Sequence, residues 1–254
     1  TFQTSPGNSR LIDVFAAVPH AKANSLIGEA YRYLPSDTVL SIWLAARRDV
    51  AALNFAHIGG YPRYHTPLDN LASFDPRVLQ HLGEYALATT RSLDAHGFAA
   101  GRSPHDDVYF AVPLVGVIHY PAAWALPLAV MLAAAMLPLA FVAHRAGTAS
   151  LWGTGRGTLA LALAIAVPVL VTLGAWRLIV LLHPDYREIL QGEPYNAGWY
   201  LLAFGAMTAV VAGGLQRWLA RRATPLDTAI PSLALWVALG IVVAIRLPGA
   251  SYLL

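Results

Sequence analysis

Residues 50–75 read VAALNFAHIGGYPRYHTPLDNLASFD and contain the signals for three successive elements. Residues 50–58 form a short apolar run bounded by charges and glycines, which is typical of a buried strand. A polar loop rich in Gly, Pro, Tyr, His and Asp follows. Asp75 is a favoured N-cap residue, and Pro76 suits the first helical position. The stretch therefore predicts a strand, a loop and a helix that runs from residue 76 to about residue 93.

The residues before this stretch predict further alternation of strands and helices. Residues 2–4 are expected to form a strand and SPGN a turn, after which Asn8 caps a helix that reaches about residue 18. A second helix is expected over residues 25–34, with Ser25 as its cap, and a third over residues 36–46. Alternating helices and strands indicate an α/β domain.

The composition divides the chain into a soluble part and a membrane part. Hydrophobic residues make up 57% of the chain and charged residues only 12%, whereas about 25% charged is usual in soluble domains. Ten of the fourteen acidic residues lie within residues 1–117, and long apolar runs follow. We expect an α/β domain over residues 1–95, a juxtamembrane linker over 96–117 and an all-α transmembrane domain over 118–254. Apolar runs of about 20 residues predict four spans, at residues 120–142, 159–182, 199–219 and 230–247.

The charges between the spans predict an orientation in the lipid bilayer. The loop after the first span holds Arg145 and Arg156, and the loop after the third is also rich in arginine. The loop between the second and third spans is acidic. Since Lys and Arg are enriched in cytoplasmic loops, we expect a multi-pass protein whose N-terminal domain lies on the periplasmic, extracellular or lumenal side.

Composition also excludes some classes of site and partner. The chain has no cysteine, so a disulfide framework and a cysteine zinc site are excluded. The net charge is only +3, and no basic stripe interleaved with aromatic residues indicates a nucleic-acid partner. The chain opens with TFQTSPGN, a strand running into a turn; we interpret it as a C-terminal fragment of a longer protein.

His65 and Tyr64 are the candidate functional residues of the polar loop. Loops after the carboxyl ends of strands often build sites, and a tyrosine phenol can donate to a developing oxyanion. An ordinary turn is the alternative interpretation. Asp69 and Asp75 fit local turn and capping roles. His57, within the predicted strand, is either a core or edge histidine or a residue that orients a ligand.

The segment LPSDTVLSIWLAARRDVAALNFAHIGGYPRYHTPLDNLASFD resembles the closing part of the catalytic domain of co-catalytic di-zinc exopeptidases, peptidase family 28 of the metallopeptidases. It is most similar to the membrane-anchored branch of endoplasmic reticulum metallopeptidases (Fxna-like). The upstream FQTSPGN is similar to that branch's FETGPGN, with Gln3 in place of Glu. The resemblance covers about residues 1–95 by motif, and the rest by layout only.

The resemblance implies a three-layer αβα peptidase domain, here incomplete, with two Zn²⁺ ions that activate a water to hydrolyse peptide bonds of a peptide substrate. His65 is then a zinc ligand and Tyr64 stabilises the tetrahedral intermediate, while Asp37 and Asp69 are structural. The family's other ligands and its general base precede the segment with which this chain begins. We therefore expect the 254 residues alone to bind zinc poorly and to be inactive.

Two other functions remain open on the sequence. A catalytically inactive relative could use the peptidase fold for binding or assembly. A transporter with a soluble appendage would show broken helices with polar residues at mid-membrane, where these spans hold mostly Ala, Leu and Val.

Overall fold

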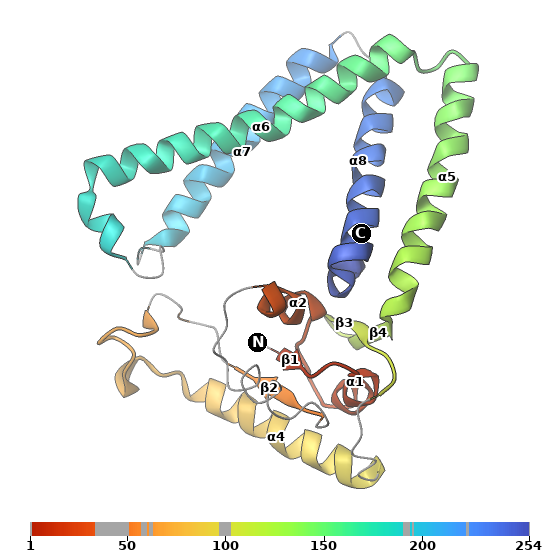
Figure 1. Ribbon diagram of the computed structural model, residues 1–254. Helices are drawn as coiled ribbons and strands as arrows, with labels where there is room; N and C mark the ends of the chain where they lie inside the picture. The colour runs from red at the N-terminus through yellow and green to blue at the C-terminus, as the bar shows by residue number, and fades with distance from the viewer. Residues whose placement is uncertain are drawn as a thin grey trace. The chain divides into compact units, whose positions relative to one another are not determined.

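The computed structural model describes residues 2–33, 51–56, 60, 63–96, 103–189, 194, 196–221 and 224–253. They fall into two compact units (Figure 1). The first comprises Thr1–Gly59, Pro67–Met131 and Ala238–Leu254, and the second Gly60–Thr66 and Leu132–Val237. Asp37, His57 and the helix expected at residues 36–46 lie outside the described residues.

The first unit combines short strands with helices. In chain order its elements are β1 (Phe2–Thr4), α1 (Ser9–Ala16), α2 (Ser25–Tyr33), β2 (Leu53–Phe55), η2 (Leu71–Ser73), α4 (Pro76–His96), β3 (Asp107–Val112), β4 (Gly116–Pro121), η3 (Ala122–Trp124) and η5 (Pro248–Leu253). β1 pairs antiparallel with β2, with Phe2 opposite Phe55. β3 and β4 form a separate antiparallel hairpin. The described residues thus confirm a mixture of small sheets and helices; the three-layer arrangement stays a prediction.

The core of this unit forms around three aromatic rings from three elements. Phe15 of α1, Phe55 of β2 and Tyr85 of α4 lie with ring centroids 5.3–5.6 Å apart. Phe15 is fully buried and Tyr85 nearly so. Edge-on and tilted aromatic pairs of this kind add stabilisation beyond the buried area. The cluster fixes α4, which follows the His65 loop, against α1 and β2.

Tyr85 also forms hydrogen bonds with two backbone groups. Burial raises the pKa of its phenol, and the hydrogen bond from the Lys22 amide offsets part of this increase. The Lys22 amide donates to Tyr85 Oη at 2.6 Å, and Oη donates to the His20 carbonyl at 3.3 Å. Tyr85→Phe is expected to cost about 1–3 kcal/mol of unfolding free energy, because both groups lose a buried partner.

The Tyr85 phenol should also make the unfolding free energy pH-dependent. Its pKa in the folded chain lies above the value of about 10 in the unfolded chain, so its contribution is complete below about pH 10 and is lost as pH rises through the folded pKa. Denaturant titration of the detergent-solubilised chain at about pH 8 and about pH 11 measures the unfolding free energy at each pH. The decrease in unfolding free energy between the two should be larger in the wild type than in Tyr85→Phe. Tyr64→Phe, a change at an exposed tyrosine, is the control and should show the same decrease as the wild type. If Tyr85→Phe does not reduce the decrease in unfolding free energy, the Tyr85 phenol is not its cause.

Two predicted helix caps differ in the structure. Asn8 occupies the N-cap position of α1 but makes no capping bond. Its Oδ1 accepts from the Asp107 amide at 2.8 Å and its Nδ2 donates to Thr4 Oγ1 at 2.9 Å, so the side chain joins β1 to β3. At α2 the cap is Asn24, whose Oδ1 accepts from the Ile27 amide. Long-range partners thus replace the expected local ones.

Ser25 is used for tertiary contact instead of capping. Its hydroxyl lies 3.1 Å from both the carbonyl and the amide of Tyr109 in β3, and 2.5 Å from the Gly249 carbonyl in η5. α2 therefore holds β3 and η5 together, although Ser25 and Gly249 are 224 positions apart in sequence.

The β3–β4 hairpin, which sequence reasoning did not anticipate, lies across the end of the expected linker and the start of the expected transmembrane domain. The apolar run that predicts the first span begins with residues of β4, among them Val117, Ile118 and Tyr120. The strand therefore cannot be distinguished from the helix that follows it by hydrophobicity alone. The first membrane-length helix accordingly begins after β4 and η3, at Ala125 instead of residue 120.

The second unit is dominated by long apolar helices. The helices of membrane-spanning type are α5 (Ala125–Arg145), α6 (Leu151–Leu182), α7 (Ala197–Ala220) and α8 (Pro225–Arg246), and α5 and α8 each extend into the first unit. All four are long and apolar enough to cross a membrane. α6 packs against α7, joined through η4 (Pro184–Glu188). The four predicted spans are therefore present as helices, with ends that differ by a few residues, except that α6 begins eight residues earlier than expected.

Asp227 connects the start of α8 to the loop before α6. It is 3% exposed. Its Oδ1 accepts from the Ser150 amide at 2.9 Å and its Oδ2 from the Thr224 amide at 3.0 Å. A Cβ added at Gly153 would collide with the Asp227 carboxylate, and one at Gly157 with the Asp227 backbone carbonyl. The two glycines let α6 and α8 approach closely, as small residues do between membrane helices.

Candidate functional site

Tyr64 and His65 lie in a tight loop in which the chain hydrogen-bonds to itself. The Arg63 amide donates to the Gly60 carbonyl at 2.8 Å. The Thr66 amide and hydroxyl both donate to the Arg63 carbonyl, at 3.1 and 2.7 Å. These bonds close one turn around residues 64 and 65, so the two side chains leave the loop side by side.

The rings of Tyr64 and His65 are stacked and exposed. Their centroids are 3.9 Å apart with an interplanar angle of 23°, and Tyr64 is 53% exposed. His65 has a φ of +59°, a region that non-glycine residues seldom adopt and that His tolerates better than most. An unusual backbone conformation at a candidate ligand is compatible with a functional constraint.

Asp69 is exposed and precedes a short capped turn. Asn70 Oδ1 accepts from the Ser73 amide at 3.2 Å, and Asn70 Nδ2 donates to the Pro67 carbonyl. The capping role in this turn thus belongs to Asn70. Nothing in this local geometry assigns chemistry to Asp69.

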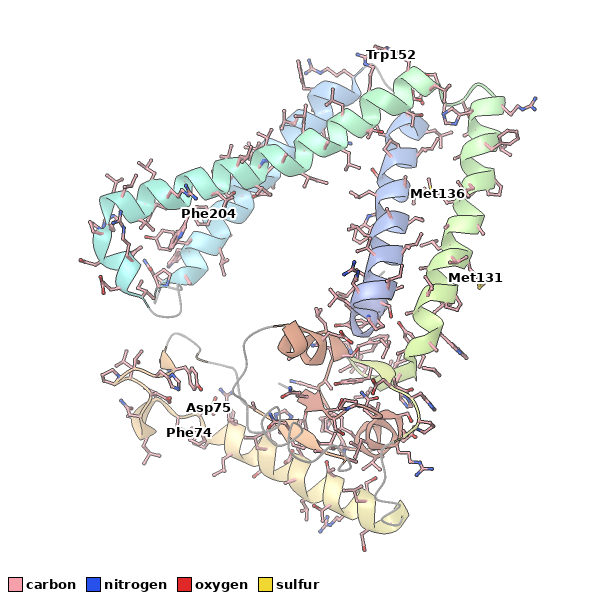
Figure 2. All side chains as sticks on the ribbon, in the orientation of Figure 1. Phe74, Asp75, Met131, Met136, Trp152 and Phe204 are labelled. Atoms are coloured by element: carbon pink, nitrogen blue, oxygen red, sulfur yellow. The ribbon has the colours of Figure 1, made fainter. Side chains whose placement is uncertain are left out.

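Asp75 begins α4, as its sequence context predicts (Figure 2). Its Oδ1 accepts from the Arg77 amide at 3.0 Å, and its carboxylate pairs with the Arg77 guanidinium at 2.6 Å. That hydrogen bond raises the pKa of Arg77. Asp75 is therefore engaged at the helix start, where a negative charge is favoured.

Gln3, which replaces the Glu of the related motif, has a structural partner. It is 8% exposed and stands opposite Asn54 across the β1–β2 pair. Its Oε1 accepts from Asn54 Nδ2 at 3.3 Å. An uncharged amide suits this buried position, since a carboxylate would carry a desolvation cost there.

A cluster of histidines and carboxylates beside the hairpin was missed by sequence reasoning. His119 Nδ1 lies 2.8 Å from Asp107 Oδ2, and its Nε2 lies 3.5 Å from Asp13 Oδ1. Asp107 is buried, and His105 Nε2 lies 3.8 Å from its Oδ1. The β3 sequence DVYFAV does not alternate polar and apolar residues, so the cluster could be found only once the register of β3 and β4, with Tyr109 opposite His119, was known.

The described residues do not by themselves fit a zinc site. Among them, no three His, Cys, Asp or Glu side chains are grouped so that they could hold a metal ion. Zinc sites use about three or four protein ligands, and His65 supplies one candidate. The donor set that the resemblance implies is therefore not brought together within this part of the chain.

A small cavity in the first unit is not a substrate site. Its volume is about 60 Å³, and Asn8, Ser25, Glu29 and Asp107 are among the residues that line it. Pockets for small organic ligands occupy about 300–1,000 Å³. This space suits water molecules that solvate the polar lining.

Residues 1–90 match the family model described as Peptidase family M28. The match includes β1, α1, α2, β2, the His65 loop and the first part of α4. This part of the chain is thus similar to a family of peptidases, which agrees with the resemblance drawn from the YHTPLDN motif. No curated protein and no solved structure matches the chain.

Proposed function

We propose that this chain is part of a membrane-bound, zinc-dependent peptidase of the aminopeptidase type. The observation that carries the proposal is the match of residues 1–90 to Peptidase family M28 in a chain that continues into four helices of membrane-spanning length. Within this proposal the peptidase domain has the three-layer αβα fold, faces the periplasm, exterior or lumen, and acts on peptides.

His65 is the proposed zinc ligand and Tyr64 the proposed partner of the reacting carbonyl. Support comes from their position in the matched segment and from their exposed, adjacent rings. Asp37 and Asp69 keep structural roles in the proposal. The remaining metal ligands and the general base would come from outside the described residues, because these hold no group able to bind a metal.

The test of this proposal is a peptidase assay on native membranes that contain the protein. We expect release of N-terminal amino acids from short peptides, loss of this activity with a zinc chelator, and recovery when zinc is added back. Membranes that contain the protein but show no chelator-sensitive activity above those lacking it would instead support the inactive, binding-only function.

The 254-residue chain alone is expected to bind zinc weakly, since a single imidazole does not make a zinc site. Calorimetric titration of the detergent-solubilised chain should show no zinc binding tighter than that of the His65→Asn variant. In a separate assay, the chain should not cleave an aminoacyl reporter. Tight binding of two zinc ions per chain, together with cleavage, would contradict this expectation.

A further inference from the structure

The turn between β3 and β4 presents only apolar side chains to its surroundings. Residues 112–116 read VPLVG. Pro113, Leu114 and Val115 are all exposed, with Leu114 fully so and Val115 at 70%. A soluble hairpin normally carries polar residues and glycine at its tip.

Leu114 also adopts a backbone conformation that is unfavourable for its residue type. The Val115 amide donates to the Val112 carbonyl at 3.2 Å, which closes a turn with Pro113 in its second position. Leu114, in the third position, has a φ of +69°. A type II turn needs a positive φ there, and glycine or asparagine is the usual solution. A leucine therefore brings both strain and exposed apolar area, with no packing gain within the described part of the protein.

The hairpin is tied to the ends of two membrane-length helices. β4 leads through η3 directly into α5, at whose base the hairpin lies (Figure 1). The ring of Phe110 in β3 stacks on Tyr252 of η5 at 4.7 Å and 10°, and Tyr120 Oη lies 2.8 Å from Ser251 Oγ. η5 begins two residues after α8 ends.

These contacts agree with four crossings of a bilayer. An even number of spans returns the chain to the side from which it entered, so the residues before α5 and after α8 can touch, as Tyr120 and Ser251 do. Tyr120, Tyr252 and the half-exposed Trp124 stand near these two ends. Tyrosine and tryptophan are enriched at membrane interfaces.

The turn also lies close along β3 to the contact between the hairpin and η5. Val112 lies two residues beyond Phe110, about 7 Å along the strand. A bilayer of about 40–45 Å has a hydrocarbon core of about 30 Å, so each headgroup layer is on the order of 5–8 Å deep. An apolar tip about 7 Å along β3 from the Phe110–Tyr252 contact, in a hairpin whose second strand leads into α5, has lipid as its natural partner.

We propose that the β3–β4 turn, residues 112–116, is a membrane-contact site in which Leu114 and Val115 enter the interfacial layer of the bilayer. This inference rests on the proposed membrane insertion of α5 and α8. It goes beyond the proposed peptidase function, because it gives the first unit a direct lipid contact besides its covalent connections to the spans.

The absence of cysteine from the chain makes single-site labelling a direct test. Leu114→Cys, Leu79→Cys and Leu137→Cys would each carry a nitroxide label in the full chain, reconstituted in phosphatidylcholine vesicles. Leu79 is an exposed residue in the first turn of α4, and Leu137 is an exposed residue within α5. The measurement is the ratio of collision rates with oxygen, which prefers lipid, to those with a water-soluble nickel chelate.

The ratio at position 114 is expected to be several-fold above that at 79 and below that at 137. Adding Leu114→Asp to a chain labelled at Val115→Cys should lower the ratio at 115 to the value at 79. Equal ratios at 114 and 79, with a lipid-type ratio at 137, would overturn the contact site while leaving membrane insertion intact. A water-type ratio at 137 would overturn the insertion of α5, and the contact site with it.

Discussion

Replacing His65 with asparagine is expected to lower the zinc-dependent peptidase activity of native membranes by about 100-fold or more. Even residues that only orient a ligand are commonly worth about 10–100-fold in metal affinity or activity, so loss of a ligand should cost at least the upper end of that range. Asparagine is the informative replacement, because it adopts the positive φ of His65 readily while it removes the imidazole.

His20→Asn is the matched control for this variant. His20 is also an exposed histidine with a positive φ, of +55°, and it lies outside the YHTPLDN motif. The control should keep wild-type activity, and both variants should keep wild-type thermal stability. If His65→Asn retains full activity at an equal amount of protein in the membrane, His65 is not a zinc ligand.

Gly157→Ala is expected to destabilise the packing of α6 against α8 by about 2–6 kcal/mol, although alanine is the better helix former. The added methyl group would meet the backbone carbonyl of Asp227, which cannot rotate away as a side chain can. Overpacking of this kind typically costs about 1–3 kcal/mol. If α8 moves to relieve the contact, the Ser150 and Thr224 amides lose their carboxylate partner, at a further cost of about 1–3 kcal/mol.

Gly155→Ala provides the control on the same helix, two residues away. A Cβ at Gly155 meets nothing within 4 Å, so the change should be neutral or stabilising by up to about 1 kcal/mol. Gly153→Ala should fall between the two, since the Asp227 carboxylate can shift at the expense of its hydrogen bonds. Unfolding of the detergent-solubilised chain by dodecyl sulfate measures the order; equal stability of all three variants would show that α6 and α8 are not closely packed there.

The elements with strong local signals could be predicted from the sequence. The four apolar helices follow from composition and length, and the start of α4 follows from Asp75 and Pro76, whose local interactions suffice to define it. Their ends were less certain, because an apolar run does not record where a strand stops and a span begins. The residues from Val117 to Tyr120 are the clearest example.

Features that depend on distant partners could not be predicted. Asn8 and Ser25 both have side chains that can cap a helix. In the folded chain the Asn8 side chain instead accepts from the Asp107 amide, and the Ser25 hydroxyl donates to the Gly249 carbonyl. The Asp107–His119 pair required knowledge of the β3–β4 register. At the candidate site, sequence reasoning named Tyr64 and His65, and the structure shows their rings stacked in one turn. Their chemistry stays a proposal. The other metal ligands would be distant in sequence, and ligands separated in sequence leave no local pattern.

The contact of Ser25 with Gly249 has a consequence for biosynthesis. A ribosome makes residues 1–131 before residues 238–254. α2 and β3 therefore cannot form their contacts with η5 until the four long helices have been synthesised. The hydroxyl of Ser25 and the ring of Phe110 thus remain without their η5 partners until η5 has been synthesised. Completion of the first unit therefore requires that α8 has already been synthesised, and a chain that stops before Pro248 would expose the surface that η5 covers.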